Sequence, residues 1–288
     1  MLSIVVFIAM VANKKDDDSD TATTRETVVS SDGKTTIKPV TAGDQIKLNN
    51  PNIIVAFPGA GMVGSISANY IIEQLELHQI AFVDSEFAIP GIIYIGGKLR
   101  HPFRLYASSD GKICVILCEI PVVGKGIHSV LNTLVKWVKY HNACELIVLD
   151  GFPRDGIPPP GRRAWILSSD RGVAYANGGL QPINNIDSHG KNVMIFVEGV
   201  SGGLLASCLS NGIKCKGIFV PSPNKMPDPE GAAILIDTIN ALGYRLLNLD
   251  SQALRKKGEK MRSQMGDLVR VMLSQQEQEK SYKPGIYS

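Results

Sequence analysis

The 288-residue sequence lacks a strong excess of charge of either sign, and this narrows the class of partner. Thirty Lys and Arg side chains stand against 27 Asp and Glu side chains, so the formal net charge is +3. Domains that bind nucleic acid or an anionic membrane surface usually concentrate basic charge on one face. We therefore predict neither nucleic acid nor membrane as a partner.

Metal-binding and redox motifs are also missing. The cysteines form no Cys-x-x-Cys pair and fall mostly inside apolar runs, and the histidines show no ligand spacing such as His-Glu-x-x-His. The cysteines are Cys114, Cys118, Cys144, Cys208 and Cys215, and the histidines are His78, His101, His128, His141 and His189. We expect reduced core cysteines in a cytoplasmic protein and no metal site.

The N-terminal apolar run is too short for a membrane span. Leu2 to Ala12 falls well below the roughly 20 apolar residues that a spanning helix needs. A signal peptide carries its positive charge before the apolar run, but here Lys14 and Lys15 follow it. We interpret residues 1–50 as a largely disordered N-terminal extension, because its polar, Thr-rich stretch can bury little surface.

From Pro51 onward, short apolar runs alternate with longer amphipathic stretches, which is typical of buried strands alternating with covering helices. Strands are expected at residues 53–57, 80–84, 103–107, 113–118, 146–150, 193–197 and 214–220, and helices at 64–77, 127–142, 203–211 and 229–242. Residues 51–249 are therefore predicted to form a three-layer α/β/α domain with a mixed, mainly parallel sheet. Ser109-Asp110-Gly111 predicts a hairpin turn in that sheet, and Asp32-Gly33 a small hairpin just before the domain.

Residues 250–279 are predicted to form a C-terminal helix. The segment is rich in Lys, Arg, Gln, Glu and Met, and its apolar residues recur at helical spacing. They are Leu254, Met261, Met265, Leu268, Val269 and Met272. We expect this stripe to dock on the domain or on another subunit. Asp228-Pro229-Glu230 supplies the cap, proline and acid that suit the start of the preceding helix.

A glycine-rich turn is the first candidate for a ligand site. Gly59-x-Gly61-x-x-Gly64 lies between an expected strand and helix, and Asp84 ends the next expected strand. This layout resembles a dinucleotide fingerprint, in which the glycines admit a pyrophosphate and the acid binds ribose hydroxyls. The alternative is that the glycines only let a strand turn sharply into a closely packed helix. Pro58, which has no N–H to donate, favours the second interpretation.

Two further sequence patterns are weaker indications of a catalytic or binding site. Gly199-Val200-Ser201-Gly202-Gly203 matches the nucleophile elbow of α/β-hydrolases, but that order requires a histidine after the serine, and the last histidine is His189. We therefore predict no catalytic residues there. Arg154, Arg162 and Arg163 flank a proline-rich loop and could hold an anion, as in a nucleoside phosphorylase, or be solvated or contact another subunit.

The last three residues form the sharpest motif. Lys283-Pro284-Gly285 end any helix, and Ile286-Tyr287-Ser288 follow with a free carboxylate. A hydrophobic residue, a penultimate tyrosine and any last residue form the motif by which activators plug into pockets of the proteasome α ring. Residues 280–288 are thus predicted to be a flexible tail whose ring, aliphatic group and carboxylate fill a slot. Ordering one tail costs entropy, so several tails on one oligomer would bind much more tightly.

Four segments in order resemble the proteasome assembly chaperone family. They are Ala56 to Ser65, Glu119-Ile120-Pro121, Gly199 to Leu205 and Met226 to Ala233. The likeness covers about residues 50–260 and is greatest to the archaeal, ATP-independent members that carry the C-terminal tail. It implies a domain akin to nucleoside phosphorylases, homo-oligomers, and binding to proteasome α subunits or their ring.

The resemblance therefore implies a non-enzymatic chaperone or adaptor that needs no cofactor. By matching position it assigns partner binding to Ile286, Tyr287 and Ser288, and it assigns the glycine motifs only as elements of the fold. From a different class, the alternative is a nucleotide-binding or nucleoside phosphorylase-like enzyme that uses the Gly59 to Gly64 turn. The N-terminal extension does not match the family pattern.

Overall fold

The structure is a computed structural model that describes residues 27–40, 46–95, 97–156, 158–159, 161–170, 195–224, 226–243, 248–261 and 263. Its strands are β1 (Val28–Val29), β2 (Thr35–Pro39), β3 (Asn52–Ala56), β4 (His78–Ser85), β5 (Ile93–Ile95), β6 (Lys98–Arg100), β7 (Phe103–Ala107), β8 (Ile113–Cys118), β9 (Glu145–Arg154), β10 (Trp165–Ser168) and β11 (Cys215–Pro223). Its helices are α1 (Val63–Gln74), α2 (Ile127–Tyr140), α3 (Gly199–Ser210) and α4 (Pro229–Ala241), with 3-10 turns η1 (Ala60–Met62) and η2 (Gly124–Gly126).

Within the described residues the main sheet has nine strands in the order β1-β2-β4-β7-β8-β3-β9-β11-β10. The central pairs β8–β3, β3–β9 and β9–β11 are parallel, and the pairs on either side are antiparallel. This confirms the predicted mixed sheet, with its parallel part at the centre. The expected hairpin at Ser109-Asp110-Gly111 is confirmed as well, because β7 and β8 pair antiparallel across it.

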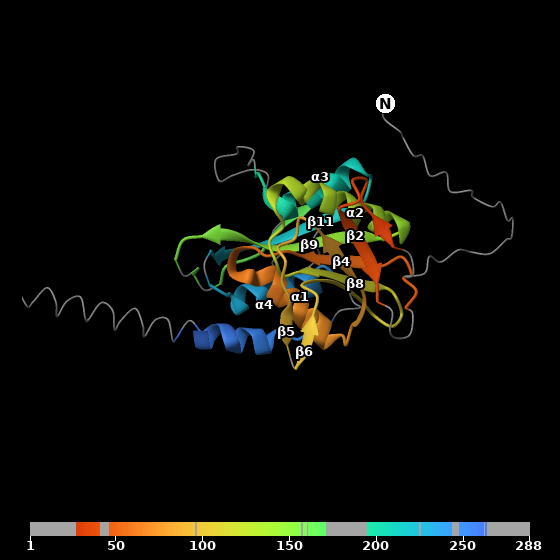
Figure 1. The fold of residues 1–288 in the computed structure, drawn as a ribbon. Helices are drawn as coiled ribbons and strands as arrows, with labels where there is room; N and C mark the ends of the chain where they lie inside the picture. The colour runs from red at the N-terminus through yellow and green to blue at the C-terminus, as the bar shows by residue number, and fades with distance from the viewer. Residues whose placement is uncertain are drawn as a thin grey trace, which may run out of the picture.

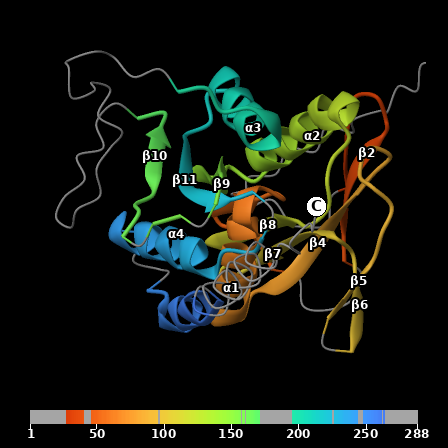
Figure 2. The same ribbon diagram turned by 90° about the vertical axis from the view of Figure 1, so that its left-hand side faces the viewer.

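Helices cover both faces of the sheet, so the predicted three layers are confirmed (Figures 1 and 2). Helices α1 and α4 pack together on one face, and α2 and α3 on the other. Strand β3 shows why its sequence reads as continuously apolar. Ile53 and Val55 point into the core under α2 and α3, whereas Ile54 and Ala56 point into the core under α1 and α4.

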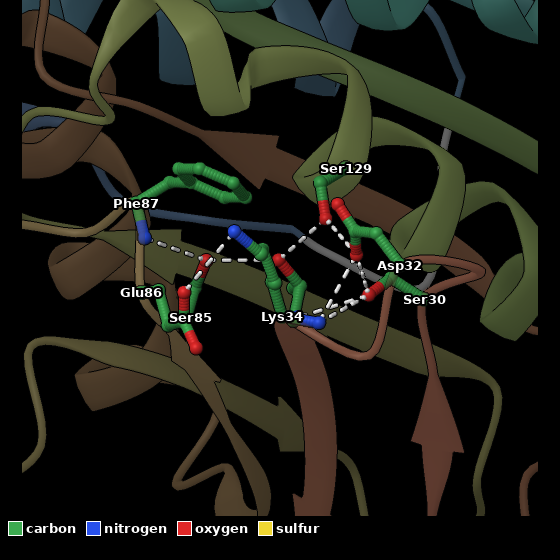
Figure 3. Close-up of polar contacts among 8 residues, drawn as sticks. Ser30, Asp32, Lys34, Ser85, Glu86, Phe87 and Ser129 are labelled. Atoms are coloured by element: carbon green, nitrogen blue, oxygen red, sulfur yellow. Dashed lines mark hydrogen bonds and ion pairs between the residues drawn. The ribbon is translucent and has the colours of Figure 1, made fainter. Parts of the chain in front are cut away.

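The β1–β2 hairpin confirms the small hairpin expected at Asp32-Gly33 and extends the main sheet. Strand β2 pairs with β4, so the sheet begins before Pro51, the predicted start of the domain. Hydroxyl groups fasten the hairpin to the domain (Figure 3). The Thr35 Oγ1 lies 2.8 Å from Ser85 Oγ and 3.0 Å from Ser129 Oγ, and Ser129 Oγ donates to an Asp32 carboxylate oxygen at 2.9 Å.

One expected strand is wrong. Residues 195–197, the part of the predicted strand 193–197 that the structure describes, have no strand conformation, and Phe196 is 82% exposed. The position beside β11 is taken instead by β10, which pairs with it antiparallel. Because β9 occupies the other edge of β11, no edge of that strand is left for residues 195–197.

Helix boundaries differ from the predicted ones by a few residues, and α4 begins as expected. Asp228 caps it by accepting a hydrogen bond from the Gly231 N–H at 2.9 Å, with Pro229 in the first turn. After α4, residues 252–261 are helical. Leu254 of the predicted stripe is buried in the core under α1 and α4, and the stripe residues from Met265 onward lie outside the described residues.

Candidate functional site

The candidate site lies where the central parallel strands end. Strand β3 leads into α1 on one face of the sheet, while β8 leads into α2 on the other face. Such a switch point opens the crevice in which α/β sheets usually bind ligands. The Gly59 to Gly64 turn follows β3 at this place, beside the neighbouring strand β9.

Protein atoms fill the space beside Gly59. A Cβ on Gly59 would lie 1.9 Å from the Asp150 carboxylate oxygen Oδ1. The missing side chain therefore lets a carboxylate of the same chain approach the turn. A phosphate approaching the turn at this point would meet that carboxylate, which occupies the space and, when ionised, repels an anion.

The other two glycines of the motif are packed just as closely. A Cβ on Gly64 would lie 2.3 Å from the Leu149 carbonyl oxygen, so this glycine sets α1 directly against β9. Gly61 has a φ of 64°, and a Cβ there would meet the Cβ atoms of Ser222 and Asp228 at 2.8 and 2.9 Å. The Asp228 N–H donates to the Gly61 carbonyl at 2.8 Å. The motif thus joins β3, α1, β9 and the start of α4.

The acid expected to complete a dinucleotide fingerprint is elsewhere. Asp84 lies on β4, and strands β7 and β8 stand between β4 and β3 in the sheet. Three strand spacings amount to roughly 14 Å. The Asp84 carboxylate accepts a bond from the Lys38 Nζ at 2.6 Å. The geometry therefore favours the interpretation of the glycines as packing devices.

Asp150 is a partly buried acid that the sequence motifs did not single out. Its oxygen Oδ2 accepts a hydrogen bond from Ser201 Oγ at 2.6 Å, and Oδ1 accepts one from the Gly151 N–H at 2.7 Å. Burial raises the pKa of the Asp150 carboxyl above its ordinary value, and these two hydrogen bonds oppose that rise. The only sequence signal was an acid at the end of a continuous apolar run.

Ser201 is therefore placed as a structural residue. Its hydroxyl bonds to Asp150, and a Cβ on the next residue, Gly202, would lie 2.0 Å from the Val197 carbonyl oxygen. A Cβ on Gly203 would lie 2.7 Å from Leu131 on α2. The Gly199 to Gly203 segment thus packs the start of α3 against β9 and α2. His189, the last histidine in the sequence, lies outside the described residues.

The three arginines considered as an anion site have different surroundings. The Arg162 Nη2 lies 2.6 and 2.5 Å from the two Asp228 carboxylate oxygens, and its side chain is 4% exposed. Arg163 is exposed and lines an open cavity of about 430 Å³ together with Arg255. Arg154 ends β9 and is also exposed.

Acidic groups balance these arginines. Glu230 and Asp237 line the same cavity as Arg163, and Asp237 forms an ion pair with Arg255. The Arg162 guanidinium is likewise neutralised by Asp228. The cavity is therefore lined by charges of both signs, and the structure gives it no concentrated positive field for an anion.

The predicted partner-binding residues Ile286, Tyr287 and Ser288 lie outside the described residues. In the part of the chain that the structure does describe, no three His, Cys, Asp or Glu side chains are grouped in a way that could hold a metal ion. None of the described helices combines the length and the apolar character that crossing a membrane requires.

Comparison with known proteins gives a family match over most of the chain. A model described as the PAC2 family matches residues 53–269. An uncharacterized protein of Methanocaldococcus jannaschii is 26% identical over 229 residues, which make up 78% of this chain and 88% of that relative. The matched residues include the Gly59 to Gly64 turn, Asp150, Ser201 and Asp228.

Solved structures share the fold. A Thermoplasma acidophilum protein of unknown function aligns with a TM-score of 0.61 at 28% identity, covering 81% of this chain and 91% of its own. Pyrococcus furiosus PbaA, described as an archaeal homolog of proteasome-assembly chaperone, aligns with a TM-score of 0.64 at 23% identity, covering 85% and 97%. Pyrococcus furiosus PbaB, described as an archaeal proteasome activator, aligns at 0.67 with 17% identity, covering 82% and 98%.

Proposed function

This chain belongs to the PAC2 family, and we propose that it is a non-enzymatic, ATP-independent chaperone or adaptor of the proteasome. In this proposal it binds proteasome α subunits, or the ring that they form, through Ile286, Tyr287 and Ser288. Its cytoplasmic homo-oligomer presents several such tails at once. The domain that carries them is akin to that of nucleoside phosphorylases but performs no phosphorolysis.

The observation that carries the proposal is the C-terminal sequence. Ile286 and Tyr287 supply an aliphatic group and an aromatic ring, and the carboxylate of Ser288 supplies a charge for a lysine in the receiving pocket. The family match and the fold shared with PbaA and PbaB support the same partner class. The closely packed glycine turn and the distant Asp84 count against the nucleotide-binding alternative.

The test is co-sedimentation with purified proteasome α rings from the same organism. The full-length chain should bind, and a chain that lacks Ile286 to Ser288 should not, while its circular dichroism spectrum stays the same. Tyr287→Ala should weaken binding about tenfold or more, because a buried aromatic anchor contributes a large part of the binding free energy. Tyr282→Ala, in the same tail but outside the motif, is the matched control and should bind as the wild type does.

Undiminished binding by the truncated chain would overturn the role of the tail. If neither form binds α rings, a thermal-shift panel of nucleotides, nucleosides and phosphate tests the alternative enzyme. A ligand that binds only the native state raises the melting temperature. We expect no shift with any member of that panel.

A further inference from the structure

The segment that joins β4 to β7 carries exposed apolar side chains on a small hairpin. Among the described residues, strands β5 and β6 pair only with each other, as a two-stranded sheet separate from the main sheet. Two-stranded hairpins of this size are marginally stable in water by themselves. Figures 1 and 2 both place this hairpin at the periphery of the domain. We call residues 89–100 the arm.

One face of the arm is apolar and open to solvent. Tyr94 on β5 and Leu99 on β6 are cross-strand partners, so their side chains share a face. They are 70% and 69% exposed, and Ile92, two residues before Tyr94, is 61% exposed. Leaving these three side chains in water is unfavourable unless another surface covers them.

The charged residues of the arm lie on its opposite face. Because side chains alternate along a strand, Lys98 and Arg100 point away from the Leu99 side of β6. Arg100 Nη1 donates to the Tyr106 hydroxyl on β7 at 3.4 Å, so Arg100 is directed toward the domain, while Lys98 is exposed. The apolar face therefore has no charge of its own within the hairpin.

The base of the arm carries two more exposed apolar side chains. The Val123 N–H donates to the Phe87 carbonyl at 2.8 Å, and Ala88 and Val122 form an isolated antiparallel bridge. Across this bridge Ile89 is opposite Pro121 and Val123 is opposite Phe87, so Ile89, which is 48% exposed, and Val123, which is 44% exposed, are diagonal neighbours on one face. We call Ile89, Ile92, Tyr94, Leu99 and Val123 the arm patch.

The arm patch has the size of a functional apolar surface patch. At roughly 200 Å² for each fully exposed side chain, its exposed fractions leave on the order of 600 Å² of surface in water, at the upper end of the roughly 300–600 Å² that the largest apolar patch of a typical monomer covers. A standard interface buries about 800 Å² on each partner, most tightly at central aromatic and aliphatic anchors. The arm patch would supply most of such a contact.

From this geometry we infer that the arm patch is the contact between copies of this chain. A patch that is uncharged can meet an identical patch without repulsion, as two-fold symmetry requires. A second copy is also present whenever the protein is present, whereas a proteasome ring would cover the patch only during binding. The inference rests on the homo-oligomer in the proposed function and names the surface that builds it.

The test uses the full-length chain and sedimentation velocity, without proteasome rings. The wild type should sediment as an oligomer, and the double variant Tyr94→Ser/Leu99→Ser should sediment as a monomer with an unchanged circular dichroism spectrum. Leu209→Ser, on α3 and 61% exposed, is the matched control and should keep the wild-type mass. A double variant with the wild-type mass, or a wild type that is itself monomeric, would overturn the inference.

A second measurement does not depend on how the variant folds. Amide hydrogen exchange of residues 92–100 in the wild type should slow at least severalfold as protein concentration rises through the association range, since association covers those amides. Unchanged exchange there would contradict the inference.

A double variant that stays oligomeric but loses ring binding would assign the patch to the ring instead. If tail deletion leaves ring binding unchanged and the double variant sediments as a monomer, the proposed role of the tail is wrong, but the assignment of the arm patch to the contact between copies stands.

Discussion

The glycine-rich junction after β3 and the β5–β6 arm leave the same edge of the sheet but differ in how their surfaces are used. At the junction, added Cβ atoms on Gly59 and Gly64 would lie 1.9 and 2.3 Å from other protein atoms. In the arm, a Cβ on Gly91 would meet nothing closer than 3.9 Å, and Tyr94 is 70% exposed. The junction is therefore filled by the chain itself, while the arm is open to another molecule.

This difference shows why a sequence motif is a poor guide to the binding surface here. A missing Cβ permits the close approach of a phosphate, but it equally permits the approach of a carboxylate or of another strand. The motif-like glycines meet Asp150 and Leu149 of their own chain. The arm has no motif, and its exposed side chains are visible only once the pairing of β5 with β6 is known.

The largest expected effect comes from Asp228 at the junction. Asp228→Ala removes the closer carboxylate partner of the buried Arg162 guanidinium, which keeps Glu230 at 4.0 Å, and it removes the cap of α4. Leaving one member of a buried pair without its partner costs about 3–5 kcal/mol. Urea unfolding should therefore show a loss of that size in the free energy of unfolding. Asp84→Ala, which breaks an exposed pair with Lys38, is the control and should cost less than about 1 kcal/mol.

If Asp228→Ala and Asp84→Ala lose similar free energies of unfolding, the buried pair at the junction contributes no more to stability than an exposed surface pair. The double variant Arg162→Ala/Asp228→Ala sharpens the result. If the two side chains stabilise the fold as a pair, the double variant should lose less than the sum of the single variants, because neither charge is left buried alone. Strict additivity would contradict the pairing.

The next effect compares one glycine from each region. Gly64→Ala forces a Cβ against the Leu149 carbonyl oxygen, a backbone atom that cannot rotate away. We expect a loss of about 3 kcal/mol in the free energy of unfolding, at the upper end of the usual cost of overpacking. Gly91→Ala in the arm should change stability by less than about 0.5 kcal/mol. Thermal unfolding of both variants measures this difference in stability. Equal melting temperatures would contradict the prediction that Gly64 is closely packed and Gly91 is not.

Much of the central fold was predictable because buried strands and covering helices leave strong patterns. Ile53 to Phe57 reads as a continuous apolar run because β3 is covered on both faces, and Asp228-Pro229-Glu230 marks the start of α4 through capping chemistry. The edge elements were less predictable. Strand β10 is short, and residues 195–197 are apolar enough to resemble a strand although β11 has no free edge for them.

The candidate site was predictable only in part. The sequence pointed to the Gly59 to Gly64 turn and to Ser201, and the structure brings both to Asp150. It could not show that Asp150 fills the turn, because that contact joins residues about 90 positions apart. Asp84 failed as a ribose-binding acid because two antiparallel strands, β7 and β8, separate its strand from β3. Local spacing does not report the order of strands in a sheet.

The smallest expected effect is a pH dependence that arises from Asp150. Burial holds the pKa of this carboxyl above its value in the unfolded chain, so the folded state binds the proton more tightly. The resulting stabilisation is fully present below the unfolded pKa, near 3.9, and is lost as the pH rises through the higher folded pKa. Asp150→Asn cannot ionise, so its stability relative to the wild type should increase as the pH rises from about 4 to about 7.

A constant penalty accompanies this change, because the amide keeps only one of the two oxygens that accept from Ser201 and Gly151. That loss amounts to about 1 kcal/mol. This loss lowers the free energy of unfolding of Asp150→Asn by the same amount at every pH. The change with pH in the difference between the variant and the wild type therefore reports the ionisation of Asp150 alone. Urea unfolding at several pH values measures it, with Asp155→Asn at an exposed position as the control. If the difference in free energy of unfolding between the wild type and Asp150→Asn stays constant with pH, the folded state does not raise the pKa of Asp150.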